Sequence, residues 1–320
     1  MKVSIKYRLE YALVRMAMFG LRYLPESLAY GGMSLLGQLS FLCSKRRQGY
    51  ALKFLRQAYP DERTDKELLS LARRATGNFL KVSMDMLRVH RVLREGSLPK
   101  YVDDLESIRE NMPGGPALVV SGHLGSWEVG AISMAHAHEE AHVVARTFKN
   151  PLLQDFLENS RRAAGLHVHS RRGGIRGLAR ALKNGAVGIQ AVDQNQRLRG
   201  VFVPFFGKIA STERAAATLA LRRGYPVVVA FCPRVGRGFR FRFEIAKVIQ
   251  PQRTPNVTDI SEAVEQLVVE INSVLEEAIR RYPEQYLWIH DRYRTQPDKQ
   301  AAGVTNQAQL ETLQADPETA

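Results

Sequence analysis

Cysteine and acidic side chains are both scarce in this sequence. Only two cysteines, Cys43 and Cys232, occur among 320 residues, far apart and each in an apolar stretch. Two isolated cysteines supply neither a disulfide framework nor a cysteine-based metal site, so we expect reduced, buried thiols in a cytoplasmic compartment. Asp and Glu number 32 against 46 Lys and Arg, which leaves a net charge of +14. This excess favours an anionic partner: a nucleic acid, an anionic membrane surface or a phosphorylated substrate.

Several catalytic and binding motifs are also absent. The sequence has no Gly-x-Ser-x-Gly nucleophile elbow and no His-Glu-x-x-His zinc signature. Aromatic residues do not interleave with the basic clusters and no DNA- or RNA-binding motif occurs, which argues against nucleic acid as the partner. The spacing of the remaining histidines does not favour a metal site, and we expect no metal or cofactor. The histidines considered are His136, His138, His142, His167, His169 and His290, the last expected to be structural.

Residues 1–45 combine apolar and basic side chains and are expected to associate with a membrane. The stretch 7–24 mixes Leu, Val, Met and Phe with arginines that recur every seven residues and therefore share one side of a helix. These arginines are Arg8, Arg15 and Arg22. Residues 27–44 are uncharged and just long enough to span a bilayer, and the basic residues 45–47 that follow favour the cytoplasmic side. A spanning helix, a helix in the membrane interface and a soluble helical hairpin packed on the core all stay open.

Residues 46–297 are expected to form the main domain, helical over 46–112 and α/β over 113–297. Short apolar runs typical of strands lie at 117–121, 142–145, 186–192, 226–231 and 241–246. Helical stretches separate most of them, which predicts an α/β fold with a largely parallel sheet flanked by helices. A further amphipathic helix is predicted over 257–281. The polar residues 298–320 are expected to form a disordered tail.

The segment Val120-Ser121-Gly122-His123-Leu124-Gly125-Ser126-Trp127-Glu128 carries the strongest chemical signal. Residues five apart on one helix point about 140° away from each other, so His123 and Glu128 meet only if His123 lies in the strand-end loop and Glu128 in the first helical turn. Open α/β sheets place their sites in such loops. An imidazole held by a carboxylate is a general base. Without a nucleophile elbow, a substrate hydroxyl is the expected nucleophile, and no acyl-enzyme is required.

This segment is similar to the His-x4-Glu motif of the bacterial lipid A biosynthesis acyltransferases, lauroyl and myristoyl transferases of the lysophospholipid acyltransferase superfamily. Three further stretches resemble that family in its order, at 146–165, 192–228 and 282–297. The last of them is similar to the family's closing Trp-x-His-x-Arg stretch. The resemblance covers residues 5–297 and is specific for the family, but much less so for the substrate.

The resemblance implies a glycerolipid-acyltransferase-like fold and a membrane-bound enzyme at the cytoplasmic face of the inner membrane. It implies transfer of a fatty acyl chain from an acyl carrier protein thioester to a hydroxyl of an anionic lipid A precursor. Acyl-CoA as donor, another glycolipid or a lysophospholipid as acceptor, and hydrolysis of acyl thioesters are the alternatives. His123 is expected to be the general base and Glu128 its orienting carboxylate. Arg161, Asp193 and Gln194 are further site residues by the same resemblance.

Elementary chemistry adds expectations for the residues around these positions. Arginine presents a planar fork to phosphate oxygens, so Arg161 and its neighbours are expected to form a basic rim for the substrate. These neighbours are Arg162, Arg171, Arg172 and Arg176. Backbone N–H groups around Gly125 are candidate donors to a developing oxyanion. Arg197 and Arg199 either grip an anionic head group or are simply solvated. The run 201–207 either lines an acyl-chain groove or forms a core strand and turn.

Overall fold

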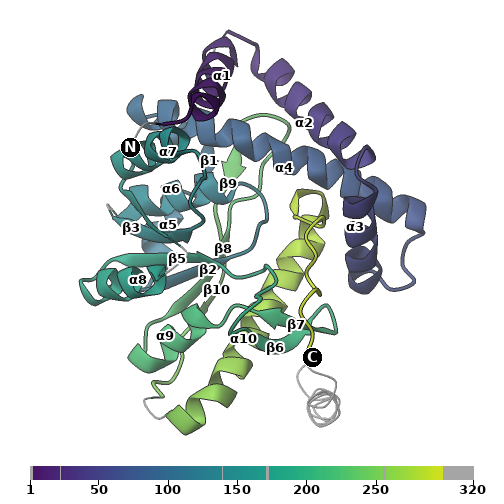
Figure 1. Ribbon diagram of the computed structural model, residues 1–320. Helices are drawn as coiled ribbons and strands as arrows, with labels where there is room; N and C mark the ends of the chain where they lie inside the picture. Colours follow the sequence, from purple (N-terminus) through teal and green to yellow (C-terminus); the bar gives the residue numbers. More distant parts are fainter. Residues whose placement is uncertain (1–2, 22, 139, 171–172, 255–256, 298–320) are drawn as a thin grey trace.

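The computed structural model describes residues 3–21, 23–138, 140–170, 173–254 and 257–297 (Figure 1). The predicted tail 298–320 therefore lies outside the described residues. The helices are α1 (Ile5–Leu21), α2 (Glu26–Leu42), α3 (Lys45–Ala58), α4 (Asp65–Arg94), α5 (Ser107–Asn111), α6 (Trp127–His138), α7 (Pro151–Ala163), α8 (Gly174–Lys183), α9 (Ala215–Arg223) and α10 (Val257–Arg281), with short 3-10 turns η1 (Leu98–Lys100) and η2 (Pro283–Gln285). The strands are β1 (Val102–Asp103), β2 (Leu118–Ser121), β3 (Ala141–Ala145), β4 (Leu166–Ser170), β5 (Val187–Ala191), β6 (Val201–Phe205), β7 (Lys208–Thr212), β8 (Val227–Phe231), β9 (Phe241–Arg242) and β10 (Glu244–Ile249).

Six of the strands form one central sheet in the order β10-β8-β2-β5-β3-β4. All neighbours in this sheet run parallel except the edge strand β10, which is antiparallel to β8. Helices cover the sheet because each parallel connection must cross from one end of a strand back to the other. The predicted α/β fold with a largely parallel sheet and flanking helices is confirmed.

The central strands are apolar without alternation because both faces of the sheet are covered. On β2, Leu118 and Val120 pack with residues of α8, α9 and α10 on one face. Val119 packs on the other face with Val129 and Ile132 of α6. Burial on both sides explains why the strand signals are short continuous apolar runs. The core is thus two apolar layers separated by the sheet.

The N-terminal helices lie at one end of the molecule, over the long helix α4 and beside α7 (Figure 1). Helix α4 begins at a capping box in which Thr64 and Glu67 satisfy each other's backbone N–H groups. Helices α1 and α2 span 17 residues each. Within the described residues, the structure contains no helix with the length and apolarity needed to cross a bilayer. Arg22 lies outside the described residues.

The run 201–207 forms the strand and turn of a hairpin, not an open groove. Strands β6 and β7 pair antiparallel. Val203 and Phe205 are fully buried, and Phe54 of α3 packs against Phe205 and Phe206 with ring centroids about 6 Å apart. Of the two sequence interpretations, the structure therefore favours the core strand and turn.

Candidate active site

Sheet register brings His123 and Asp193 together. Strands β2 and β5 are parallel neighbours, with their last residues, Ser121 and Ala191, directly opposite. His123 and Asp193 each follow two residues later. The chain leaves β2 toward β3 on one side of the sheet and leaves β5, through the β6–β7 hairpin and α9, toward β8 on the other. Loops that diverge in this way open a crevice at the carboxyl ends of the strands, where α/β proteins bind ligands.

Asp193 holds His123 by two hydrogen bonds. Its Oδ1 lies 2.8 Å from His123 Nδ1, and its Oδ2 accepts the backbone N–H of His123 at 2.8 Å. Asp193 is buried, whereas 21% of the His123 side chain is exposed. Burial acts to raise the pKa of Asp193, but the charge and hydrogen bonds of His123 outweigh it and hold that pKa at about 2. Asp193 is therefore ionised at any physiological pH.

The same contact sets the proton position on the imidazole. Burial acts to lower the pKa of His123, but the charge and hydrogen bond of Asp193 outweigh it, so that pKa lies above its ordinary value. In the neutral ring the proton sits on Nδ1, where it donates to Asp193, and Nε2 keeps its lone pair. The amide nitrogen of Gln194 lies 3.2 Å from Nε2 and can donate to it. The dyad therefore presents a base on the side opposite Asp193.

The expected contact between His123 and Glu128 is wrong. His123 lies in the loop and Glu128 in the first turn of α6, as predicted, but Glu128 turns toward α7 and accepts two hydrogen bonds from Arg161, each of 2.8 Å. Both side chains are almost fully buried. The guanidinium fork of Arg161 thus occupies both carboxylate oxygens of Glu128. Asp193 is the carboxylate that contacts the imidazole.

Gly125 shapes the loop and does not offer a free donor. We name residues 122–126 the His123 loop. The N–H of Gly125 donates to the carbonyl of Gln285 at 3.0 Å, and that of Ser126 donates to the carbonyl of Cys232 at 2.9 Å. Gly125 has φ +65°, and a Cβ there would lie 2.3 Å from the Cys232 oxygen. The predicted oxyanion donors around Gly125 are thus already used within the protein.

Sequence reasoning missed a set of supporting residues near the C-terminus. We name residues 285–292 the closing segment. Burial raises the pKa of Tyr286, and the charge of Asp193 raises it further. The charge of Arg292 helps to lower the pKa of Asp193. His290 Nε2 accepts the N–H of Asn195 at 3.0 Å. Buried Arg292 donates to the Ser211 carbonyl and the Thr212 hydroxyl of β7. The resemblance to the closing Trp-x-His-x-Arg stretch was the one signal that could have identified these residues.

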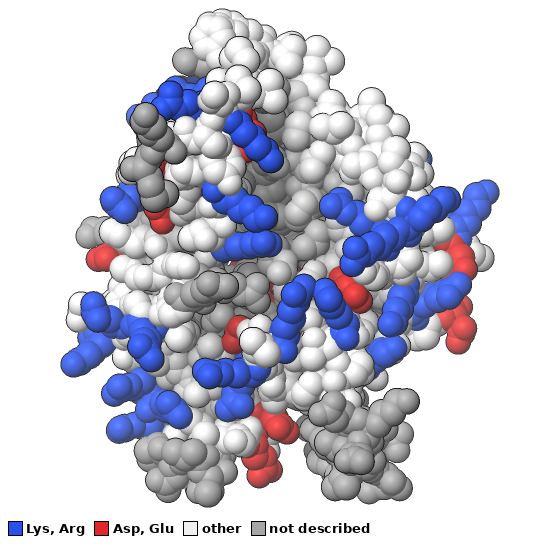
Figure 2. All heavy atoms as spheres, viewed as in Figure 1, with Lys and Arg blue, Asp and Glu red and all other residues white. Residues whose placement is uncertain are grey.

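The basic residues around the site differ in how they are paired. Arg162 and Arg176 are exposed, whereas Arg171 and Arg172 lie outside the described residues. Arg197 and Arg199 flank Leu198, which is 79% exposed, in the loop after Asp193, and neither makes an ion pair with a described residue. Figure 2 shows Lys and Arg on both sides of a hollow in the middle of this face. An anionic substrate would therefore meet positive charge on approach.

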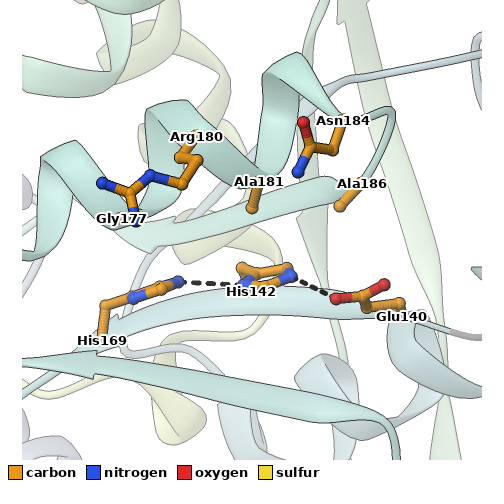
Figure 3. Close-up of a pocket in the computed structure, with 8 residues that line it drawn as sticks. All are labelled: Glu140, His142, His169, Gly177, Arg180, Ala181, Asn184 and Ala186. Carbon is orange, nitrogen blue, oxygen red and sulfur yellow. Dashed lines mark hydrogen bonds and ion pairs between the residues drawn. The ribbon is translucent and has the colours of Figure 1, made fainter.

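A histidine cluster lies on β3 and on the neighbouring edge strand β4 (Figure 3). His142 of β3 contacts His169 of β4 at 2.9 Å and Glu140 at 2.7 Å, and these residues line a pocket together with Arg180 of α8. Within the described part of the chain, no group of three or more His, Cys, Asp or Glu is arranged to hold a metal ion. Glu140 directly precedes β3 and the lining residue Ala186 directly precedes β5, so this part of the pocket is at the opposite end of the strands from His123.

An imidazole held by a buried carboxylate, at the switch point of a parallel sheet, is an arrangement typical of enzymes that activate a hydroxyl or water by general-base catalysis. The model of the bacterial lipid A biosynthesis acyltransferases matches residues 2–295. The chain is 26% identical over 289 residues to a lipid A biosynthesis lauroyltransferase of Escherichia coli (strain K12), covering 86% of this chain and 88% of the relative. It is 26% identical over 262 residues to a lipid A biosynthesis palmitoleoyltransferase of the same organism, covering 79% and 80%.

The chain belongs to the bacterial lipid A biosynthesis acyltransferase family. It is an acyltransferase, and its family acts in lipid A biosynthesis. The sequence resemblance to this family is confirmed.

Proposed function

We propose that the protein transfers a fatty acyl chain from an acyl carrier protein thioester to a hydroxyl of a lipid A precursor, with His123 as the general base. The observation that carries this proposal is the contact of His123 Nδ1 with buried Asp193, because it leaves Nε2 as the basic ring nitrogen whenever the imidazole is neutral. Family membership supports the acyl transfer. The names of the relatives, a lauroyltransferase and a palmitoleoyltransferase, support a long-chain acyl group.

The proposed reaction begins when the acceptor hydroxyl replaces the Gln194 amide at His123 Nε2. The imidazole takes the hydroxyl proton as the oxygen attacks the thioester carbonyl, and Asp193 stabilises the imidazolium. The tetrahedral intermediate then expels the thiolate, the new ester forms, and the imidazolium returns its proton to the sulfur. Asp193 remains ionised throughout because its pKa is about 2.

The surroundings of His123 support direct transfer without an acyl-enzyme. The hydrogen-bond partners of its ring are Asp193 and Gln194, and neither is a nucleophile for acyl transfer in this geometry. Buried Cys232 lies behind the His123 loop, and burial raises the pKa of its thiol far above its ordinary value. A thiol that stays protonated is a poor nucleophile. A substrate hydroxyl is therefore the proposed attacking group.

Glu128 and Arg161 have a different proposed role. Their buried pair joins the first turn of α6 to the last turn of α7, and Trp127, beside Glu128, places its ring 5.1 Å from the ring of His123. The pair therefore fixes the helix start against which the imidazole packs. We assign it to the support of the site and assign the proton transfer to His123 and Asp193.

We propose that α1 and α2 lie in the cytoplasmic interface of the inner membrane. Both helices expose large apolar side chains to solvent: Ile5, Leu9, Leu13, Met16, Phe19, Leu28, Leu35, Leu36, Leu39 and Leu42. At the spacing in α1 these residues form one stripe along the helix. The end of the molecule formed by α1 and α2 carries few charges on the face in Figure 2, and Lys and Arg gather below it. Anionic lipid head groups would meet this basic face.

A transfer assay with mass-spectrometric readout tests the proposed function. Wild type, His123→Ala and His136→Ala are given acyl carrier protein or CoA thioesters with a lipid A precursor, a lysophospholipid or another glycolipid. His136 is an exposed histidine on α6 and serves as the matched control. We expect one acyl mass gained by the lipid A precursor from the carrier-protein donor, retained in His136→Ala and reduced by roughly 100- to 10,000-fold in His123→Ala.

Other products would redirect the proposal. Acylation only from CoA, or only of another lipid, would replace the donor or the acceptor and keep the chemistry. Free fatty acid without any acylated lipid would identify a thioester hydrolase. An active His123→Ala enzyme would contradict the proposed mechanism.

A further inference from the structure

The His123 loop is fastened to two other segments at the carboxyl end of the sheet. Isolated β-bridges join Leu124 to Tyr286 and Gly125 to Cys232. The Gly125 N–H donates to the carbonyl of Gln285, and the Ser126 N–H donates to the carbonyl of Cys232. The loop that carries the catalytic imidazole therefore lies between the closing segment and the chain that leaves β8.

The side chain of Gln285 joins these two flanking segments to each other. Its Oε1 accepts the backbone N–H of Arg234 at 2.8 Å, and its Nε2 donates to the carbonyl of Arg234 at 3.0 Å. A primary amide is the side chain that can donate and accept side by side, and here it pairs with one residue's backbone as a neighbouring strand would. Gln285 thus contacts the loop through its main chain and Arg234 through its side chain.

Both ends of this connection are anchored on helix α4. Asn78 donates to the carbonyl of Glu284 at 2.7 Å, one residue before Gln285. Asp85, seven residues further along the same helix, is completely buried and pairs with the guanidinium of Arg234, which also donates to the Gly238 carbonyl. Residues seven apart lie on the same side of a helix. The long helix α4 is therefore a common base for the two segments that Gln285 connects.

We propose that Gln285 is a positioning residue for acyl transfer, which locks the His123 loop between the closing segment and Arg234. The inference rests on the proposed function for its kinetic consequence but not for its structural one. Without the amide pairing, the closing segment separates from Arg234 more often, and the Gly125 and Ser126 hydrogen bonds open with it. His123 Nε2 is then misplaced relative to the acceptor hydroxyl for part of the time. Misplacement of a base reduces turnover more than binding.

Two substitutions test the proposal. Gln285→Glu keeps the size of the side chain but replaces the donor with an oxygen that faces the Arg234 carbonyl. Gln285→Met removes both hydrogen bonds at similar length. Gln266 is exposed on α10, with its amide near Glu262, so Gln266→Glu and Gln266→Met are the matched controls.

The first readout is hydrogen exchange by mass spectrometry of the full-length protein. We expect the amides of Gly125 and Ser126 to exchange at least about tenfold faster in both Gln285 variants, with α10 and β3 unchanged. The second readout is steady-state acyl transfer, for which we expect kcat to fall roughly 10- to 100-fold while both KM values stay within about twofold. Both Gln266 controls should match wild type.

The two readouts separate this inference from the proposed function. If wild type transfers no acyl group, the proposed function fails, but the exchange rates still decide whether Gln285 locks the loop. Wild-type exchange at Gly125 and Ser126 in both Gln285 variants would overturn the inference. So would an activity loss that is carried by KM, or one that disappears when rates are corrected for the folded fraction measured by thermal unfolding.

Discussion

Asp193 and Glu128 are both buried carboxylates next to the His123 loop, but they pair with chemically different partners. Glu128 faces a guanidinium that occupies both of its oxygens, and both side chains are almost fully buried. Asp193 faces an imidazole that uses one nitrogen for the contact and keeps the other toward the partly open side of the site. A carboxylate paired with arginine can only hold structure, because arginine does not exchange protons at physiological pH. A carboxylate paired with histidine can tune a base.

Replacing Asp193 should have the largest effect on catalysis. Asp193→Asn keeps the size of the side chain but removes the charge that stabilises the imidazolium and selects the Nδ1-protonated ring. We expect kcat to fall by roughly 100- to 10,000-fold with KM little changed. Steady-state kinetics on folded enzyme, verified by circular dichroism, checks this. Retention of more than a tenth of wild-type kcat would show that His123 works without Asp193.

Breaking the Glu128–Arg161 pair should instead reduce stability. Glu128→Gln leaves a buried guanidinium without a counter-charge, which we expect to lower the free energy of unfolding by about 3–5 kcal/mol. The double variant Glu128→Leu/Arg161→Met should recover much of this loss, because it removes both charges together. Denaturant unfolding measures both effects.

The activity of the same variant sharpens the comparison. If Glu128 only supports the helix start, the folded fraction of Glu128→Gln keeps kcat within about tenfold of wild type. A loss as large as that of Asp193→Asn, without a loss of stability, would return Glu128 to the catalytic role that the sequence suggested.

The sequence predicted that His123 lies in the strand-end loop but not which carboxylate contacts it, for a physical reason. His123 follows an apolar run and precedes a helix start, and both signals are local. Asp193 lies 70 residues further along, and only the pairing of Ser121 with Ala191 brings the two side chains together. Strand order and register depend on the whole sheet, so no local spacing reveals them. Glu128 was expected to be the partner because it lies close to His123 in the chain and completes the His-x4-Glu motif.

The other predictions divide in the same way, between local sequence patterns and contacts that form only in the folded chain. The strand runs and the helix over 257–281 were predictable because burial and amphipathicity leave a periodic pattern. The use of the Gly125 N–H by Gln285 was not, since it depends on a contact between segments 160 positions apart in the chain. Sequence reasoning thus found the elements and the candidate residues, whereas the tertiary pairings decided which residues act together.

The pH dependence of transfer tests the tuning of His123 by Asp193. Only the neutral imidazole can accept a proton, and the pKa of His123 is raised, so activity should rise with pH through a midpoint above the ordinary histidine value of about 6.5. Asp193 has a pKa of about 2 and adds no second transition in this range. In Asp193→Asn the residual activity should have its midpoint at lower pH than wild type. The pH profile of kcat/KM measures both midpoints.

The stability of the dyad has the opposite pH dependence. Because the folded pKa of His123 is raised, its contribution is complete below the unfolded pKa and is lost as the pH rises through the folded pKa. Activity and this part of the stability should therefore change in opposite directions over the same pH window. Identical midpoints of the kcat/KM profiles in wild type and Asp193→Asn would mean that Asp193 does not raise the pKa of His123.

The smallest expected effect concerns the arginines, which also divide into one that is buried in an ion pair and others that are exposed. Arg161 is buried and paired with Glu128, so we propose that exposed arginines such as Arg197 and Arg199 bind the anionic acceptor. We expect Arg197→Gln and Arg199→Gln each to raise KM for a phosphorylated acceptor by roughly two- to fivefold with kcat unchanged, since exposed charges contribute little each. The effect should shrink at high salt, because screening weakens exposed charges first. Arg222→Gln, at an exposed arginine on α9, is the control. A change in kcat in place of KM in the Arg197 or Arg199 variant would assign the loop after Asp193 to the reaction itself and not to binding.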